Sequence, residues 1–365
     1  MDHITDYIGW MGDFPIRAIG FQDADALVLC MLSYFDFRPL RETAGEDMRV
    51  RDCIPLLASG KIRVLITGAD MGYMEVLKAA AGSARYGDLR IVHAEDILSS
   101  DPPLQFSAVT FQDEDSFGFI AYRGTDSSLA GWREDFMISF THTRSQELAL
   151  EYAREHVCEG RRWYLGGHSK GGNEALYAAC MLEDGQWARV ERLYILDGPG
   201  LCPEVDDGSK TRRVDEKTVR IIPVSSVVGR LFEPKIRDTR IVKSSAIGIM
   251  QHALPTWGVD HGKLLQVAEN DAFSQWVHSV MDKWISGISL EDRMILVDDL
   301  FSVFEESGVQ SLEEVPRVLP EKLDRILLRL SKMSPVTRKI ALDLPKVAFL
   351  TSLGIQGKSG GGENA

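Results

Sequence analysis

The sequence predicts an α/β protein with a mostly parallel central β-sheet, followed by a helical C-terminal appendage. Short apolar runs typical of buried parallel strands alternate with segments of helical spacing through about residue 262. From residue 263 onward the sequence is amphipathic and poor in strand-like runs, which indicates helices. The chain has 365 residues, 44% of them hydrophobic, so it can bury one large core and carry a smaller unit.

The helices and strands of the first 262 residues are expected in a regular order. Residues 23–34 show the helix pattern, because carboxylates come first, near the positive end of the helix dipole, and apolar residues follow. An alternating run, a polar turn and a second apolar run at residues 106–122 indicate a β-hairpin that feeds a buried strand. In full, helices are expected at residues 23–34, 72–82, 145–158 and 173–182, and strands at 89–92, 106–111, 117–122, 162–165, 193–196 and 219–222.

The C-terminal part has a different character. Its amphipathic segments lie at residues 264–285, 290–305, 312–315 and 323–333. We therefore expect an α/β domain over 1–262, a helical subdomain over 263–355 and a flexible tail over 356–365. The helices are a candidate contact for a protein partner, although their charge runs are also typical of solvated faces.

Composition and charge exclude several kinds of partner. The net charge of −13 repels phosphate backbones, so we expect no nucleic acid partner. The 5 cysteines are scattered and none has CxxC spacing, which argues against a disulfide framework and a zinc site. We see no signal peptide and no apolar run near the roughly 20 residues of a transmembrane segment. These observations together predict a soluble, cytoplasmic protein.

The main functional motif is a G-x-S-x-G pattern at residues 167–171, with Ser169 at its centre. The pattern alone occurs by chance in many proteins, but here an apolar strand precedes it and an Ala-rich helix follows it. That context is the nucleophile elbow of an α/β-hydrolase, a sharp strand-to-helix turn on which close packing demands small neighbours. A phosphate-binding loop is excluded, since the spacing G-x-x-x-x-G-K is absent. Ser169 is therefore the predicted nucleophile.

A second motif supplies the expected oxyanion hole. The strand that ends in Tyr122 runs into Arg-Gly-Thr-Asp at residues 123–126, about 45 residues before the elbow. In an α/β-hydrolase, one oxyanion donor comes from such an earlier strand end and the other from the residue after the nucleophile. By itself the segment is an ordinary turn, but beside the elbow it predicts backbone donors at Thr125 and Lys170. Asp126 either orients this loop or lies in a solvent-exposed turn.

Three motifs in this order carry a family resemblance. They are Tyr-Arg-Gly-Thr at 122–125, Trp-Arg-Glu-Asp-Phe at 132–136 and Gly-His-Ser-Lys-Gly-Gly-Asn at 167–173. With them the chain resembles the fungal-type class-three lipases, and more closely a bacterial family of uncharacterised lipase-like α/β-hydrolases. The closer resemblance extends to residues 23–37, 105–111, 197–200 and 251–252, and so covers residues 1 to about 260. It implies the fold and acyl-lipid or other carboxylic ester substrates, with little specificity for any one substrate.

The general base is expected among the late histidines. Triad residues of this fold follow the order serine, acid, histidine, which leaves His252 and His261, with His278 on the appended helix. His252 lies in a loop-like stretch and matches the Gln-His…Trp pattern of the resembling family, so it is the predicted base. His261 is the alternative, and His168, inside the elbow, points away from the site in that family.

The triad acid stays open at this stage. The resembling families usually carry Asp at the position of Ser225, whereas Asp197 follows an earlier strand. Three alternatives stay open: Asp197 serves as the acid, or Ser225 or Ser226 orients His252 by a neutral hydrogen bond, or the enzyme is impaired. With Gly198 beside it, Asp197 is also typical of a simple turn former.

The expected function is that of a serine hydrolase. It would cleave a carboxylic ester or thioester, from a small molecule or a lipid, through an acyl-enzyme on Ser169, with no metal or organic cofactor. The alternative is a catalytically impaired hydrolase fold that acts as a binding or interaction protein, and Ser225 is its main support. Candidate lids are residues 60–99 and 231–249.

Overall fold

The computed structural model describes most of the chain, which divides into two compact units, Met1–Asn270 and Asp271–Ala365. The first of these is called the N-terminal unit below, and the sequence placed its end at residue 262. The expected outer limits of the helical subdomain and of the tail stay predictions. The described residues are 1–45, 47–66, 72–114, 116–125, 133–134, 137–138, 141–306, 333–340 and 342–343.

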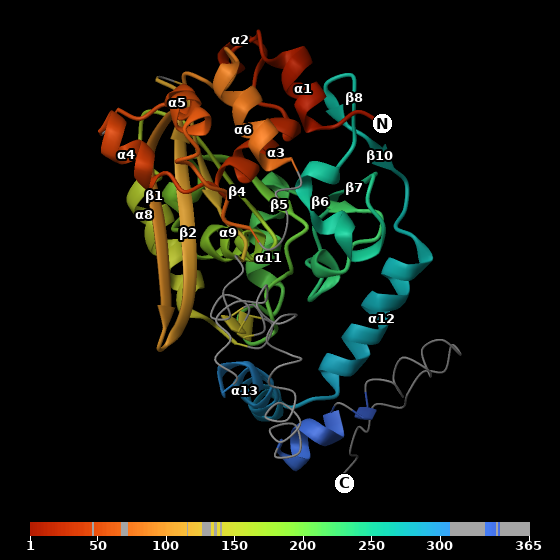
Figure 1. Ribbon diagram of the computed structural model, residues 1–365. Coiled ribbons are helices and arrows are strands. Elements are labelled where there is room, and N and C mark those ends of the chain that lie inside the picture. Colours follow the sequence, from red (N-terminus) through yellow and green to blue (C-terminus); the bar gives the residue numbers. More distant parts are fainter. Residues whose placement is uncertain are drawn as a thin grey trace. The chain divides into compact units, whose positions relative to one another are not determined.

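The N-terminal unit is built around an eight-stranded sheet with the strand order β1-β2-β3-β4-β5-β6-β7-β10 (Figure 1). Strands β3 to β7 are parallel to one another, whereas β1–β2, β2–β3 and β7–β10 pair antiparallel. The predicted α/β class with a mostly parallel sheet is thereby confirmed. The strands are β1 (Arg90–Ser100), β2 (Pro103–Gln112), β3 (Phe117–Tyr122), β4 (Arg162–His168), β5 (Val190–Leu196), β6 (Thr218–Pro223), β7 (Asp238–Val242) and β10 (Gln266–Val267), with a separate pair β8 (Val259–Asp260) and β9 (Lys263–Leu264).

Helices cover both faces of the sheet, so its central strands are apolar throughout. On one face, Phe119, Tyr164 and Tyr194 pack with α1, α3 and α6 in one hydrophobic cluster. On the other face, Ile120 and Leu165 pack with α8 and α9 in a second cluster. The helices of this unit are α1 (Ile4–Met11), α2 (Ile16–Ile19), α3 (Asp23–Leu32), α4 (Arg38–Ala44), α5 (Cys53–Ala58), α6 (Tyr73–Gly82), α8 (Arg144–His156), α9 (Lys170–Met181), α10 (Asp184–Trp187) and α11 (Ser209–Val214).

Short 3₁₀ helices complete the loops at the strand ends. One of them, η4 (Gly248–His252), carries His252. The others are η1 (Val50–Asp52), η2 (Asp215–Lys217), η3 (Val228–Arg230) and η5 (Leu254–Thr256).

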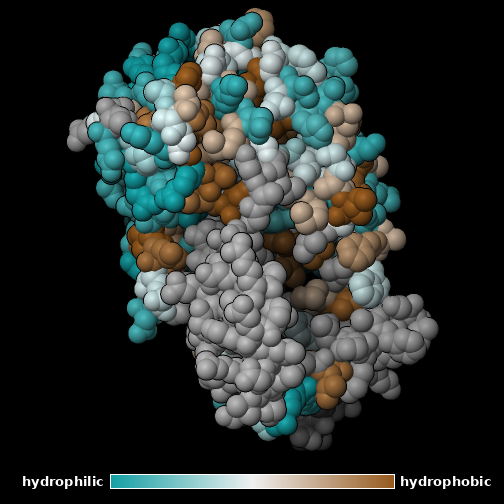
Figure 2. Space-filling view, in the orientation of Figure 1, coloured by the Kyte–Doolittle hydropathy of each residue, from teal (hydrophilic) through white to brown (hydrophobic). Residues whose placement is uncertain are grey.

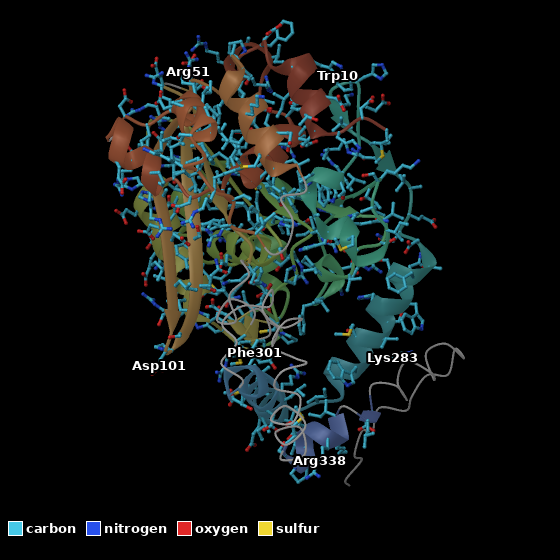
Figure 3. All side chains as sticks on the ribbon, in the orientation of Figure 1. Trp10, Arg51, Asp101, Lys283, Phe301 and Arg338 are labelled. Atoms are coloured by element: carbon cyan, nitrogen blue, oxygen red, sulfur yellow. The ribbon has the colours of Figure 1, made fainter. Side chains whose placement is uncertain are left out.

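Two sheet edges differ from the sequence prediction. Strand β1 runs to Ser100 instead of ending at residue 92, because its polar residues alternate and pair with β2 along the hairpin whose tip is labelled at Asp101 in Figure 3. Next to the other edge, which the short strand β10 forms, β7 was missed, since its sequence Asp-Thr-Arg-Ile-Val lacks an apolar run. The helix predicted from residue 264 begins at Ala272, since residues 263–267 form β9 and β10 instead.

The C-terminal unit is helical where it is described. It contains α12 (Ala272–Ser286) and α13 (Leu290–Glu306). A carboxylate oxygen of Asp299 accepts hydrogen bonds from the Ser334 N–H at 2.9 Å and the Thr337 hydroxyl at 2.6 Å, which ties residues 334–337 to α13. The segment expected at 312–315, all but the last residue of the one expected at 323–333, and the tail at 356–365 lie outside the described residues.

The surface of the N-terminal unit is mixed in polarity. On the face shown in Figure 2, hydrophobic and hydrophilic residues are interspersed over this unit, as on most folded proteins. None of the helices in the described ranges is long and apolar enough to cross a membrane.

Candidate active site

Ser169 occupies a strained turn between β4 and α9. Its backbone angles are φ 59° and ψ −130°, in the left-handed half of the map that non-glycine residues rarely adopt. A Cβ on Gly167 would overlap the carbonyl oxygen of Gly171, and a Cβ on Gly171 would overlap that of Tyr122. Both glycines of the motif are therefore required by close backbone approach, as the elbow predicts.

The elbow lies at the carboxyl edge of the sheet. The Ser169 N–H donates to the carbonyl of Leu196 at the end of the neighbouring strand β5, at 3.0 Å. Because β3, β4 and β5 are parallel, the loops that follow them meet at this edge. The turn thus lies at the sheet edge where the sequence predicts a nucleophile elbow.

Asp197 and His252 form a hydrogen-bonded pair at the same edge. His252 Nδ1 lies 2.7 Å from Asp197 Oδ2, and the Asp197 side chain is fully buried. Asp197 Oδ1 accepts the Ser226 hydroxyl at 2.5 Å and the Gly229 N–H at 3.2 Å. With the carboxylate as acceptor, the imidazole hydrogen belongs on Nδ1, which leaves Nε2 of His252 as the basic nitrogen.

The two serines after β6 have different places. Ser226 donates to Asp197 and so lies behind the carboxylate instead of contacting His252 directly. Ser225 donates its backbone N–H to the side chain of Gln251 at 2.9 Å, next to His252 in the chain. The structure thus brings Asp197 to His252, while Ser225 fixes the neighbouring Gln251.

His261 is placed differently from His252. Its side chain is 95% exposed, is hydrogen-bonded to Asp260 and stacks on Trp10, which is labelled at the surface in Figure 3. His261 is therefore a surface residue next to α1.

The loop after β3 lies against the nucleophile. A Cβ on Gly124 would be 3.0 Å from Ser169 Cβ and 2.8 Å from the carbonyl oxygen of His168, so backbone alone fits there. Thr125 is the next residue along this loop. On the other side, Lys170 begins α9, and the first N–H groups of a helix have no acceptor within the helix. Asp126 lies outside the described residues.

The Lys170 side chain points away from the nucleophile into a buried polar cluster. Its ammonium donates to Glu134 Oε2 at 2.8 Å and to Gln105 Oε1 at 3.1 Å. Glu134 also accepts the N–H groups of Gln105 and Ser145, at 2.8 and 3.2 Å. Sequence reasoning missed this cluster, although Glu134 stands within the Trp-Arg-Glu-Asp-Phe motif. It ties β2 and the start of α8 to the helix that begins at the elbow.

Ser169 and His252 are not joined directly. Among the described residues, no hydrogen bond links Ser169 Oγ to His252, although both lie at the same sheet edge. Such catalytic contacts are commonly long without substrate and shorten when it binds. The same described residues contain no group of three or more His, Cys, Asp or Glu side chains arranged to hold a metal ion.

The two expected lid segments differ in how far their apolar residues are buried. Within residues 60–99, α6 buries Val76 and Leu77, and residues 67–71 lie outside the described part of the chain. In the second candidate, residues 231–249, Ile247 is 88% exposed just before the helix turn that carries His252. The second segment thus carries an exposed apolar residue close to His252 in the chain, whereas the exposed Leu98 of the first candidate lies in β1.

Comparison with known proteins identifies a family to which the chain is similar. A family model described as Mbeg1-like matches residues 80–302. The chain belongs to the Mbeg1-like family. The matched region contains Ser169, Asp197 and His252, and it leaves α1 to α5 outside. Among solved structures, the crystal structure of M37 lipase is similar at 15% identity and a TM-score of 0.37, covering 57% of this chain and 70% of that chain. No curated protein matches the chain.

Proposed function

We propose that this Mbeg1-like protein is a serine hydrolase that cleaves a carboxylic ester or thioester through an acyl-enzyme on Ser169. The observation that carries the proposal is that a strained serine and a buried Asp197–His252 pair meet at one sheet edge. A turn with positive φ at a non-glycine residue has an energetic cost, and such strain gathers at functional sites. A purely structural turn would need neither the strain nor a buried carboxylate paired with histidine.

The residues divide the chemistry as follows. His252 Nε2 removes the hydroxyl proton of Ser169 as its oxygen attacks the carbonyl carbon, and Asp197 stabilises the imidazolium that forms. Backbone N–H groups of Thr125 and Lys170 bind the oxyanion. Collapse of the tetrahedral intermediate expels the alcohol or thiol, which takes the proton from His252. Water then attacks the acyl group by the same steps, releases the acid and restores Ser169.

The proposal assigns the triad acid to Asp197 on electrostatic grounds. A buried carboxylate is costly unless donors surround it, and Asp197 accepts from His252, Ser226 and Gly229. The turn that presents the Gly229 N–H is itself held, because Arg220 donates to the Gly229 carbonyl at 2.5 Å. Burial lowers the pKa of Arg220, and the neighbouring carboxylates, Glu233 first and then Asp197, oppose that shift. The surroundings of Asp197 thus stabilise a negative charge on its carboxylate.

Hydrolysis of p-nitrophenyl esters of two to ten carbons tests the proposal. We expect turnover by the full-length protein that Ser169→Ala and His252→Ala reduce by several orders of magnitude. Ser99→Ala and His261→Ala are matched controls on the exposed hairpin and surface, and they should retain full turnover. Turnover that survives Ser169→Ala would refute the assignment. No turnover by the wild type on any ester would favour the alternative, a hydrolase fold that acts in binding.

A further inference from the structure

Two buried side chains connect the oxyanion loop to the residue that carries the base. The Gly124 N–H donates to the Tyr34 hydroxyl oxygen at 3.1 Å. The Tyr34 hydroxyl lies 2.8 Å from His168 Nδ1, and His168 Nε2 lies 2.9 Å from the backbone carbonyl oxygen of His252. We call these three contacts the Tyr34–His168 relay. They involve Gly124, which precedes Thr125, His168, which precedes Ser169, and the proposed base His252.

The donor and the acceptor of each hydrogen bond in the relay are determined by the chemistry of its atoms. A carbonyl oxygen can only accept, so His168 Nε2 carries the hydrogen and donates it to His252. His168 Nδ1 then has a lone pair and accepts the Tyr34 hydroxyl hydrogen, while the Tyr34 oxygen accepts the Gly124 N–H. Every donor in the relay meets one acceptor, and the tautomer of His168 is determined by it.

Burial keeps both side chains in the required protonation state. Tyr34 and His168 are 3% and 4% exposed. Burial, and then the nearby His252, hold the pKa of His168 well below its ordinary value, so the ring stays neutral. Burial likewise raises the pKa of Tyr34 well above its ordinary value, so the hydroxyl keeps its hydrogen. The relay therefore persists throughout the pH range in which an ester hydrolase works.

The surrounding packing leaves the relay little freedom. The His168 ring packs against the His252 ring with centroids 4.4 Å apart, and the Tyr34 ring meets Tyr73 edge-on at 5.4 Å. A Cβ on Gly124 would overlap the Tyr34 hydroxyl, so the loop backbone rests directly on that side chain. Movement of either ring would displace the oxyanion loop or the segment that carries His252.

We propose that Tyr34 and His168 are positioning residues that set the spacing between the oxyanion loop at Gly124 and the base His252. This inference rests on the proposed hydrolase function of the same site. Asp197 fixes the imidazole of His252 through Nδ1, and His168 fixes its backbone through the carbonyl. A misplacement of about 1 Å in such a site costs on the order of 100-fold in rate, so this support has a measurable effect. Tyr34 follows α3 and precedes the region matched by the Mbeg1-like family model, so the N-terminal helices contribute directly to the site.

Two substitutions of His168 separate the two halves of the relay. The amide of His168→Asn reaches the position of Nδ1 and keeps an acceptor for Tyr34, but it loses the donor to His252. The longer amide of His168→Gln reaches the position of Nε2 and keeps the donor to His252, but it loses the acceptor for Tyr34. Tyr34→Phe breaks the contact that His168→Gln breaks and also removes the acceptor of the Gly124 N–H. Tyr7→Phe is a matched control that removes another buried tyrosine hydroxyl, bound to Asp25 at 2.9 Å.

The experiment measures kcat, KM and the downfield proton resonance of His252 Nδ1–H in each full-length variant. We expect His168→Asn to move that resonance and to lower kcat by about 10- to 100-fold with KM nearly unchanged. His168→Gln should leave the resonance in place and still lower kcat through the oxyanion loop. Adding His168→Gln to Tyr34→Phe should cause no further loss, because Tyr34→Phe has already removed the contact that His168→Gln breaks. Tyr7→Phe should lower the Tm and leave kcat and the resonance unchanged.

Two results would overturn the inference, and both differ from a failure of the proposed function. The first result is that His168→Asn and Tyr34→Phe fold, keep the wild-type kcat and leave the His252 resonance unmoved. The relay would then be ordinary buried hydrogen bonding without a positioning role. Independent, multiplicative losses from Tyr34→Phe and His168→Gln would show that they do not act through one contact. The resonance is recorded without substrate, so it tests positioning even if the wild type hydrolyses no ester, a result that would count against the hydrolase proposal alone.

Discussion

Replacement of Asp197 by asparagine tests the acid assignment with almost no change in shape. The amide oxygen can still accept from Ser226 and Gly229, so the two contacts that hold the turn survive. The amide nitrogen, however, is a donor and faces the Nδ1–H of His252, where the carboxylate oxygen lies at 2.7 Å. To keep a hydrogen bond there, His252 must move its hydrogen to Nε2 and so lose the basic nitrogen that the proposed mechanism needs.

The magnitude follows from that change of tautomer. In a serine protease the equivalent change lowers kcat on the order of 10⁴-fold. Four factors of ten at about 1.36 kcal/mol each amount to roughly 5.4 kcal/mol of transition-state stabilisation. The charge-assisted hydrogen bond to His252 contributes about 1.5–3 kcal/mol to folding, and removal of the buried charge offsets part of its loss. The free energy of unfolding should therefore change much less than the activation free energy.

The assay is steady-state ester hydrolysis beside chemical unfolding, with Asp207→Asn as the control. Asp207 is an exposed aspartate, and its replacement should leave kcat unchanged. Asp197→Asn should be folded and nearly inactive. A folded Asp197→Asn protein with kcat within about tenfold of the wild type would refute the reasoning, because loss of the triad acid costs on the order of 10⁴-fold in a serine protease. In that case Asp197 would be a turn former only.

Three further predictions follow from neighbouring contacts. Ser226→Ala removes one donor from Asp197 and should lower kcat by about tenfold, or ~1.4 kcal/mol, without abolishing it; an unchanged kcat would contradict this. Glu134→Gln removes the closer of two anionic partners of the buried Lys170, at 2.8 Å against 3.6 Å for Glu174, and should lower the free energy of unfolding by about 3 kcal/mol in urea titrations, whereas wild-type stability would argue against the cluster. Burial, and then the neighbouring His93, lower the pKa of His156 from 6.5 to about 4. Between these two pH values His156 is protonated in the unfolded chain but neutral in the folded protein, so protonation favours unfolding. The Tm should therefore fall as the pH is lowered from 6.5 to 4. His156→Gln should flatten that decline, and an equal decline in the variant would contradict the assignment.

Local features of the site could be predicted from the sequence, and long-range ones could not. The elbow at Ser169 is encoded within five residues, since the glycines are required by backbone approach inside that turn. His252 was selected by order along the chain and a family pattern. For Asp197 the roles of triad acid and turn former stayed level, because the choice depends on which loops meet at the sheet edge. Tyr34 was missed because it meets His168 across 134 residues, and no spacing rule connects them.

The fold shows the same division. The central strands were predicted because they are buried on both faces and therefore apolar throughout, as in β3. Prediction was weaker toward the sheet edges. Most of β1 and the short edge strand β10 were missed, and so was β7 beside β10, which carries Asp, Thr and Arg instead of an apolar run. The partner role of the C-terminal helices and the extent of that subdomain stay predictions.

The most direct test of the central claim is whether Ser169 reacts as an activated nucleophile. The full-length protein is incubated with a fluorophosphonate, and the adduct is located by peptide mass spectrometry beside Ser169→Ala, His252→Ala and His261→Ala. The account predicts one adduct on Ser169, absent in Ser169→Ala, much slower in His252→Ala and unchanged in His261→Ala. An unlabelled wild type, or label on another residue that persists in Ser169→Ala, would contradict it.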